Sequence, residues 1–356
     1  MEAMTSAAPT IHRPLWRRVM VSAILLAGLI SGPGLPGQAR ERADRGNTGD
    51  QLLRLLDTVP AKSGFAFSEL TPEGPRLIHG EREDDLFAVG SSFKLFILGR
   101  LAEALNRGKA HLDDTMNLSA DFTGPPQSEL AEWPIGSPVT LHTLALKMIS
   151  ISDNTATDHL LHHLGRRNVE GQMVAMGHGT PQRNRPLLST REMVMLRDLN
   201  VPSRRRRWAE LDEAGRRAFL SGEISALHDF EAIEFDTTGY TWAEWFASPM
   251  DMARALDWLR THTEEIDDAH PLRAVLSLRT QIPFDEEIWP YTGFKGGSED
   301  QVLAGNWLLR HRSGRWFALT VAFNKPDGAI DQEAVAAVLK QMTEVIEASL
   351  ESALGR

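Results

Sequence analysis

The sequence contains no cysteine among its 356 residues. This absence excludes disulfide bonds, a cysteine nucleophile and a lipid-modified cysteine at the junction of a signal sequence. Stability must therefore come from burial of a core, which a chain of this length permits. The 42 % apolar and 24 % charged fractions are typical of a folded protein and indicate one large domain or two interlocked ones.

The sequence also has no excess of positive charge. Its formal net charge is −10 at pH 7, and removal of residues 1–39, which hold three arginines and one glutamate, makes the charge more negative. A surface of this sign has no general attraction for phosphate backbones. We therefore expect no nucleic-acid partner.

The apolar run near the N-terminus is too short for a membrane anchor. Residues 19–30 are only 12 residues long, whereas a spanning helix needs about 20. Arg13, Arg17 and Arg18 precede this run, and the small residues Gly37-Gln38-Ala39 follow it. The pattern is typical of a secretory signal over residues 1–39, with an uncleaved anchor as the alternative. It predicts a periplasmic or secreted protein, and the paired arginines leave twin-arginine export open.

Strand patterns at both ends of the chain enclose a helical block. Residues 51–59 and 331–350 are predicted helices, and residues 91–270 are mostly helical. The predicted strands are residues 63–70, 75–80, a short strand opened by Phe294, 302–310 and 316–324. This order predicts an α+β fold with a mainly antiparallel sheet flanked by helices. We expect a discontinuous α/β subdomain, residues 40–90 and 276–356, around a helical subdomain, residues 91–275.

A lysine lies where the sequence predicts the buried start of a helix. Lys94 shares a helical stripe with Ile97, Leu98 and Leu101, and Ser91 lies one turn earlier on the same face. Burial of an ammonium group is costly unless the group is paired or functional. A serine beside a desolvated lysine is one form of activated nucleophile.

Two further motifs lie downstream in the sequence. Ser152-Asp153-Asn154 opens a predicted helix, and Lys295-Gly296-Gly297-Ser298 lies in the strand that Phe294 opens. Taken alone, Ser152 also fits a helix N-cap, and the glycine pair also fits a turn. Together with Ser-x-x-Lys, the motifs resemble those of the penicillin-recognising serine hydrolases, above all class A β-lactamases, over residues 49–350. The resemblance implies the serine β-lactamase/transpeptidase-like fold.

The resemblance implies a role for each residue in acyl transfer. Ser91 is implied to be the acylated nucleophile and Lys94 its base. The backbone N–H groups of Ser91 and Ser298 would bind the oxyanion. Ser152 would pass a proton to the leaving nitrogen.

The same resemblance implies the contacts to substrate. Asn154 would bind the substrate amide, and Lys295 would keep the site positive for an anionic carboxylate. Gly297 completes the Lys-x-Gly triplet beside the oxyanion donor. No metal or organic cofactor is implied.

The sequence departs from the family at two places. The loop before residue 190 is short and contains no Glu-x-x-Leu-Asn motif, which supplies the deacylating base in class A enzymes. Glu192 lies inside a helical segment and is interpreted as structural, and Asn184 is a weak candidate for lining the loop. Gly296 replaces the usual hydroxyl residue, and the next strand has no arginine before Arg310. The short loop and the LSTREM segment also resemble esterase-like proteins of clavam biosynthesis clusters.

Other conspicuous residues are interpreted without a catalytic role. His159, His162 and His163 lack the carboxylate pattern of a metal site. The run of arginines at residues 204–207 lies in a predicted insertion, residues 199–245, and is interpreted as solvated. Packing roles are assigned to four aromatic residues: Trp242, Trp245, Phe246 and Tyr291.

The sequence thus predicts an exported serine hydrolase that acts through Ser91. We expect a monomer whose substrate is a small anionic β-lactam, or a related ester or amide. An esterase or D-alanyl-peptide hydrolase is the alternative enzyme. A penicillin-binding or sensor-type relative that does not turn over is the alternative from another class.

Overall fold

The computed structural model describes residues 48–354, except 126–127, 228–229, 231 and 264–269. The predicted signal sequence lies outside the described residues. Within them, no helix combines the length and the apolar character that crossing a membrane requires.

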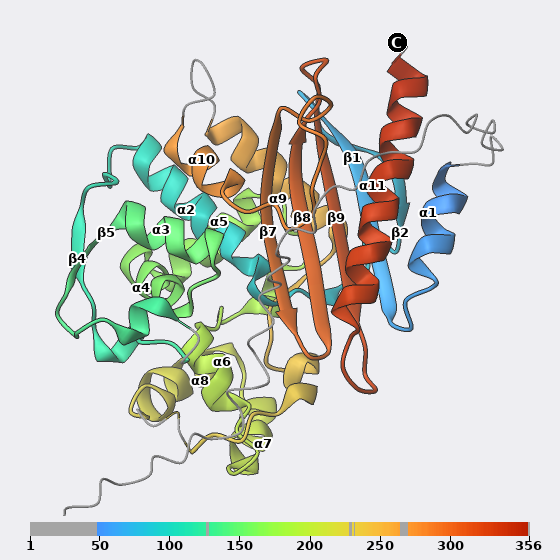
Figure 1. The fold of residues 1–356 in the computed structure, drawn as a ribbon. Helices are drawn as coiled ribbons and strands as arrows, with labels where there is room; N and C mark the ends of the chain where they lie inside the picture. The colour runs from blue at the N-terminus through green and yellow to red at the C-terminus, as the bar shows by residue number, and fades with distance from the viewer. Residues whose placement is uncertain (1–47, 126–127, 228–229, 231, 264–269, 355–356) are drawn as a thin grey trace, which may run out of the picture.

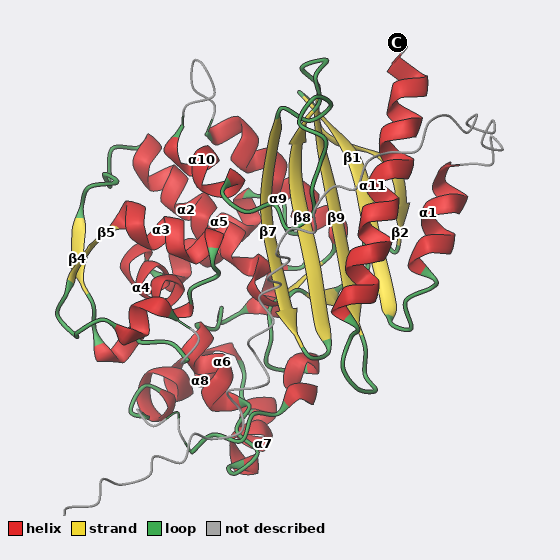
Figure 2. Cartoon of the chain, viewed as in Figure 1, coloured by secondary structure: helices red, strands yellow, loops and turns green. Residues whose placement is uncertain are grey.

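A five-stranded antiparallel sheet forms the centre of the molecule, as predicted (Figure 2). Its strand order is β2-β1-β9-β8-β7. The strands are β1 (Lys62–Thr71), β2 (Gly74–Glu81), β7 (Tyr291–Glu299), β8 (Val302–Arg310) and β9 (Trp316–Asn324). Strands β8 and β9 have the predicted bounds, and β9 is buried along almost its whole length because helices cover both faces. Short turns join β1 to β2, β7 to β8 and β8 to β9, as antiparallel pairing allows, whereas β1 and β9 are neighbours from distant parts of the chain.

Helices α1 (Thr48–Leu56) and α11 (Gln332–Leu354) cover one face of the sheet (Figure 1). Their apolar side chains form a core with those of β1, β8 and β9. Helix α1 begins three residues before its predicted start, and Asp50 in its first turn interacts favourably with the helix dipole. It also ends three residues early, because the residue before Pro60 disfavours helical backbone.

The other face of the sheet packs against a larger, mainly helical core. Helix α9 (Pro249–His262) lies directly on the sheet, and α2 (Lys94–Asn106) packs against α9. The remaining elements of this part are β4 (Thr115–Asn117), β5 (Pro138–Thr140), α3 (Leu141–Ser150), α4 (Asn154–Leu164), α5 (Arg166–Ala175) and α10 (Pro271–Ser277). The α+β fold class predicted from the sequence is confirmed.

A third group of helices lies near the C-terminal end of β7 (Figure 1). These helices are α6 (Thr190–Leu196), α7 (Pro202–Glu210) and α8 (Glu213–Phe219). The chain then returns through β6 (Phe246–Ala247), which pairs with β3 (Phe87–Ala88). Helix α6 has only seven residues, and the segment after it corresponds to the insertion predicted at residues 199–245.

Candidate active site

The serine motif lies on a tight turn that leads into α2. A 3-10 helix, Gly90–Phe93, precedes α2, and Gly90 has a φ of +52°, which favours glycine. Ser91 is partly exposed, whereas Ser92 is fully buried and its Oγ accepts a 2.9 Å hydrogen bond from Asn306 Nδ2. Of the two adjacent hydroxyls, only that of Ser91 is accessible to a substrate.

Lys94 is fully buried and reaches across to the second motif. Its Nζ donates to Ser152 O at 2.6 Å and to Asn154 Oδ1 at 2.8 Å, and it lies 3.1 Å from Ser152 Oγ. Burial lowers the pKa of Lys94 to about 7, with the charges of Asp153 and Asp158 opposing the shift. No hydrogen bond joins Lys94 to Ser91 among the described residues, and catalytic contacts of this kind often tighten only with substrate bound.

The Ser152 hydroxyl lies between two lysines. Lys295 Nζ is 3.1 Å from Ser152 Oγ and donates to Gly296 O at 2.6 Å. Burial, followed by the charge of Lys94, lowers the pKa of Lys295 well below its usual range. A hydroxyl group both donates and accepts hydrogen bonds, so Ser152 can bond to both amines at once.

Ser152 has a strained backbone that its surroundings hold in place. Its φ is +61°, a conformation that is uncommon for a residue other than glycine. Asp153, not Ser152, caps α4, through a 2.8 Å bond from Ala156 N to Asp153 Oδ1. The N-cap interpretation of Ser152 is therefore wrong, because the helix begins one residue later and leaves the Ser152 hydroxyl to the lysines.

Gly297 allows β7 to approach the turn that holds Ser91. A Cβ atom at this position would lie 2.1 Å from Val89 O and 2.5 Å from Ser91 N. A Cβ on Gly90 would lie 3.3 Å from Ser298 N. The backbone N–H groups of Ser91 and Ser298 therefore lie on two segments in close contact, and only glycine fits at residue 297.

As the sequence indicated, strand β8 carries no arginine before Arg310 that could bind a substrate carboxylate. Gly296 packs near the Phe294 ring, and the side chain of Ser298 is exposed. Arg310 pairs in register with Tyr291, the first residue of β7, four residues before Lys295. The two buried lysines are thus the positive groups nearest to Ser152.

Glu192 has a structural role, as predicted. It accepts two hydrogen bonds from Arg166, at 2.6 and 2.7 Å, and one from Ser189 N at 2.8 Å. Ser189 and Glu192 form a capping box at the start of α6. Asn184 is also structural, because it bonds both Phe246 N and Phe246 O at 2.8 Å.

Thr190 is a neighbour of the site that the sequence interpretation missed. Its Oγ1 donates to Asn154 O at 3.4 Å, and its backbone N donates to Asp158 Oδ1 at 2.7 Å. Burial raises the pKa of Asp158 to about 6. The Ser-x-x-Glu capping pattern at residues 189–192 is the signal that would have placed the start of α6.

A buried ionic cluster next to the site was also missed. Arg197 Nη1 lies 3.1 Å from Glu244 Oε2 and 2.8 Å from Glu299 Oε2, and Glu299 directly follows Ser298. Burial and the charge of Glu299 raise the pKa of Glu244 well above its usual range. The cluster ties the end of β7 to the segment after α6.

The histidines bond to the backbone or pack on rings. His159 Nε2 accepts from Ser119 N at 2.8 Å, and its Nδ1 bonds Thr155 O at 2.8 Å. His162 stacks on Phe122 with ring centroids 4.2 Å apart. Outside the masked ranges, no group of three histidine, aspartate or glutamate residues is placed to hold a metal ion.

The structure agrees in most positions with the packing roles assigned to four aromatic residues and with the solvent exposure assigned to the arginine run. Trp245 and Phe246 are buried and Trp242 is half-buried. Tyr291 packs edge-on against Trp316. In the arginine run, Arg204 pairs with Asp198, and the other three lie on the exposed surface of α7.

Comparison with solved structures defines the class of protein that has this fold. The structure called PBP-A matches with a TM-score of 0.57 at 16 % identity, over 86 % of this chain and 97 % of that one. A β-lactamase from Chitinophaga pinensis matches with a TM-score of 0.59 at 14 % identity, over 86 % of this chain and all of that one. The fold is that of the serine β-lactamases and penicillin-binding proteins.

The family follows from the sequence comparison. The model of the β-lactamase enzyme family matches residues 48–271, and the chain belongs to that family. It is also 31 % identical over 117 residues to a β-lactamase of Rhodobacter capsulatus. That alignment covers 33 % of this chain and 38 % of the length of the relative.

Proposed function

We propose that this protein is a serine hydrolase that forms an acyl-enzyme through Ser91 and hydrolyses β-lactams. One observation carries the proposal: the hydroxyl of Ser152, a residue with a strained backbone, lies 3.1 Å from two buried lysine amines. One of these lysines, Lys94, follows the partly exposed Ser91 by three residues. Strained residues and buried ionisable groups of this kind cluster at catalytic sites. Membership of the β-lactamase family supports the choice of substrate.

The proposed reaction begins with neutral Lys94. Its amine takes the Ser91 hydroxyl proton while Oγ attacks the lactam carbonyl carbon, and the carbonyl oxygen becomes an oxyanion. The backbone N–H groups of Ser91 and Ser298 stabilise that charge. The C–N bond then breaks, and the nitrogen takes the Ser152 proton, which the Lys94 ammonium replaces.

The substrate is proposed to be a small anion. Lys295, in its protonated form, attracts the substrate carboxylate. The Asn154 side chain binds the substrate amide once its hydrogen bond to Lys94 shifts. The mature protein is proposed to act outside the cytoplasm, because residues 1–39 carry the features of a secretory signal. It is also proposed to be a monomer. N-terminal sequencing and sedimentation of the exported protein test these two points.

Deacylation is proposed to be the slower step. Within the described ranges, no carboxylate is hydrogen-bonded to or ion-paired with Ser91, Lys94 or Asn154, and Glu192 is held by Arg166. Loss of a general base slows a step by about 10²–10⁴-fold. This observation also favours the second candidate function, an esterase or peptide hydrolase whose acyl group is released without that base. It equally favours a penicillin-binding relative that keeps the acyl group and does not turn over.

Intact-mass spectrometry tests the proposal. The protein is mixed with benzylpenicillin or a cephalosporin and followed over time beside Ser91→Ala. Ser92→Ala is the matched control, since it removes the adjacent, buried hydroxyl.

A mass increase equal to the drug, present in the control and absent from Ser91→Ala, supports acylation at Ser91. Consumption of many equivalents of drug supports a β-lactamase, whereas a persistent one-to-one adduct supports the second candidate. An adduct that survives in Ser91→Ala overturns the assignment of the nucleophile. No adduct together with no consumption of drug overturns the β-lactam proposal and directs the search to ester substrates.

A further inference from the structure

Three buried charged side chains meet at the end of β7. The side chains of Arg197, which ends α6, and Glu244 are fully buried, and that of Glu299, the last residue of β7, is almost fully buried. Arg197 Nη1 lies 3.1 Å from Glu244 Oε2 and 2.8 Å from Glu299 Oε2. We refer to these three residues as the ionic cluster. A buried ion pair is weak evidence for stability, so the place of the cluster in the fold is its informative property.

Arg197 is a fixed point in this cluster. Its Nε donates to Asp236 O at 2.9 Å and its Nη2 to Thr237 O at 3.1 Å. Its guanidinium group lies 4.3 Å from the centroid of the Phe235 ring. A Cβ atom at Gly239 would lie 2.5 Å from Arg197 Nε, so the backbone packs directly on this side chain. The guanidinium group therefore offers the two acids a partner with a defined position.

Glu299 connects this fixed point to one proposed oxyanion donor. Glu299 directly follows Ser298, whose backbone N–H is the second proposed donor. It also forms the last pair of the β7–β8 ladder, with Val302. The ion pair between Glu299 and Arg197 therefore adds a side-chain contact at the point where the backbone pairing stops.

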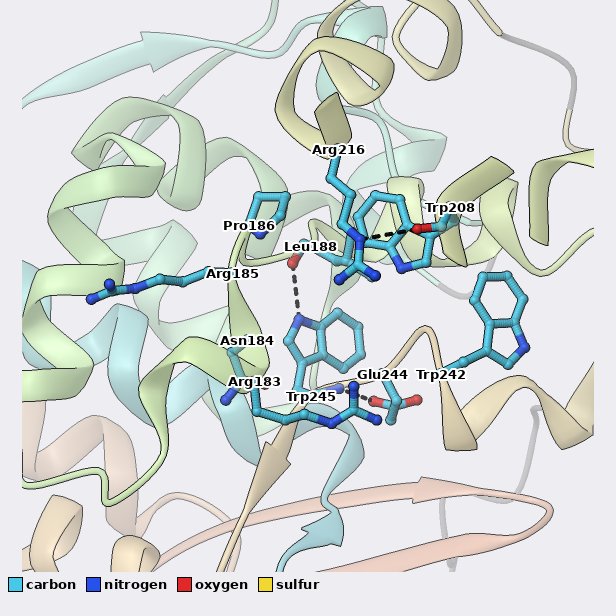
Figure 3. Close-up of a pocket in the computed structure, with 10 residues that line it drawn as sticks. All are labelled: Arg183, Asn184, Arg185, Pro186, Leu188, Trp208, Arg216, Trp242, Glu244 and Trp245. Carbon is cyan, nitrogen blue, oxygen red and sulfur yellow. Dashed lines mark hydrogen bonds between the residues drawn. The ribbon is translucent and has the colours of Figure 1, made fainter. Parts of the chain in front are cut away.

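Glu244 connects the same fixed point to the other donor. Its Oε1 accepts a hydrogen bond from Trp245 N at 2.9 Å (Figure 3). Trp245 O in turn accepts from Val89 N at 2.9 Å, and the Trp245 ring stacks on Phe93 with ring centroids 3.9 Å apart. Val89 and Phe93 lie on either side of Ser91, so Trp245 holds the turn that carries the first proposed donor.

We infer that the ionic cluster positions the oxyanion site. Through Glu299 it holds the Ser298 N–H, and through Glu244 and Trp245 it holds the turn that carries the Ser91 N–H. Donors that are fixed in advance stabilise a developing oxyanion most strongly. The glycine at residue 297 brings the two segments into contact, and the cluster fixes their alignment. The inference rests on the proposed acyl transfer through Ser91 and assigns positioning residues to it.

Phenylboronic acid is the probe that tests the inference. Ser91 Oγ forms a bond to boron, the hydroxyl proton passes to Lys94, and no bond to boron breaks. The resulting tetrahedral anion places one oxygen between the two N–H donors. Isothermal titration calorimetry measures the affinity, and boron NMR reports the tetrahedral adduct, which must be absent from Ser91→Ala.

Glu299→Ala is the variant that removes the contact at the end of β7. It is expected to weaken phenylboronic acid by about 10–10²-fold, since a small misplacement of reacting groups has effects of this size. Arg197 keeps Glu244 as its partner, so no buried cation is left alone.

Two further variants separate positioning from stability. Glu299→Gln is the conservative variant, because its amide oxygen faces Arg197 and its NH2 group donates to Glu244, in place of the hydrogen bond between the two acids. Its affinity is expected to stay close to that of the native protein. Leu350→Ala, in the core on the other face of the sheet, is the stability control. It is expected to lower the melting temperature and to leave the affinity unchanged.

Native affinity in Glu299→Ala overturns the inference, as does an equal loss in Leu350→Ala. Equal losses in Glu299→Gln and Glu299→Ala also overturn it, because the contact with Arg197 would then not be what holds the strand. So does the lack of a tetrahedral adduct in the native protein.

The probe is not a β-lactam, so the result is distinguishable from that of the proposed function. A protein that leaves every β-lactam intact but shows the expected boronate pattern loses its proposed substrate and keeps this inference. Acylation by benzylpenicillin together with native boronate affinity in Glu299→Ala gives the reverse.

Discussion

The pH dependence of acylation is the sharpest consequence of the buried lysine. Lys94 must be neutral to accept the Ser91 proton, and burial lowers its pKa from 10.5 to about 7. With that pKa, about a tenth of the molecules have a neutral Lys94 at pH 6 and about nine-tenths at pH 8. The acylation rate is therefore expected to rise about tenfold between pH 6 and pH 8 and to change little above that.

The assay is the second-order rate of adduct formation with benzylpenicillin, measured by quenched-flow intact mass spectrometry from pH 5.5 to 9.5. A lysine with its ordinary pKa would instead give about tenfold per pH unit across the whole range. A rate that keeps rising in this way, or that is flat from pH 5.5 to 8, refutes the reasoning.

Asp158→Asn provides a directional check on the same prediction. The charge of Asp158 raises the pKa of Lys94, against the effect of burial. Its removal is therefore expected to move the midpoint of the profile to lower pH. The amide oxygen of asparagine still accepts the bond from Thr190 N, but its NH2 group cannot accept the second backbone bond, from Arg191 N. The melting temperature of the variant is therefore measured beside its pH profile. A midpoint that moves to higher pH contradicts the electrostatic account.

Three further variants test the arrangement around the site. Ser152→Ala removes the hydroxyl between the two lysines and is expected to slow acylation by about 10²–10⁴-fold with little change in melting temperature; an unchanged rate removes Ser152 from the proton path. Gly297→Ala places a methyl group 2.1 Å from Val89 O and is expected to destabilise by about 1–3 kcal/mol in urea titrations. By contrast, Gly171→Ala in α5, with open space around it, stabilises by up to about 1 kcal/mol; similar values for the two would contradict the packing. Arg197→Leu leaves two buried carboxyl groups without their cation and is expected to cost about 3–5 kcal/mol, whereas Arg207→Gln, in an exposed pair, costs under about 1 kcal/mol.

The sheet could be predicted because its signal is local. The segments at residues 302–310 and 316–324 are rich in strand-forming residues and are flanked by breakers, so their bounds agree with β8 and β9. The signal for α6 to α8 was weaker. Helix α6 is only seven residues long, and all of its residues are buried. Its position therefore depends on tertiary contacts, which the hydrophobic periodicity of the sequence does not reveal.

For the candidate site, too, the local features could be predicted from the sequence and the tertiary ones could not. The chemical types and their order along the chain are visible in the three motifs, including the single turn that separates Ser91 from Lys94. The +61° φ of Ser152 and the capping of α4 by Asp153 were not predictable. Both depend on which backbone and side-chain groups fold around residues 152 and 153.

The sequence by itself determined which reactive groups are present and how far apart they lie along the chain. Only the tertiary structure decided that one hydroxyl lies between Lys94 and Lys295, residues 201 positions apart in the sequence, and that both amines are buried. The pKa of a lysine depends on the water that surrounding segments exclude and on the charges they bring close. Those segments come from all parts of the chain, and so the reactivity of the motif is a property of the fold.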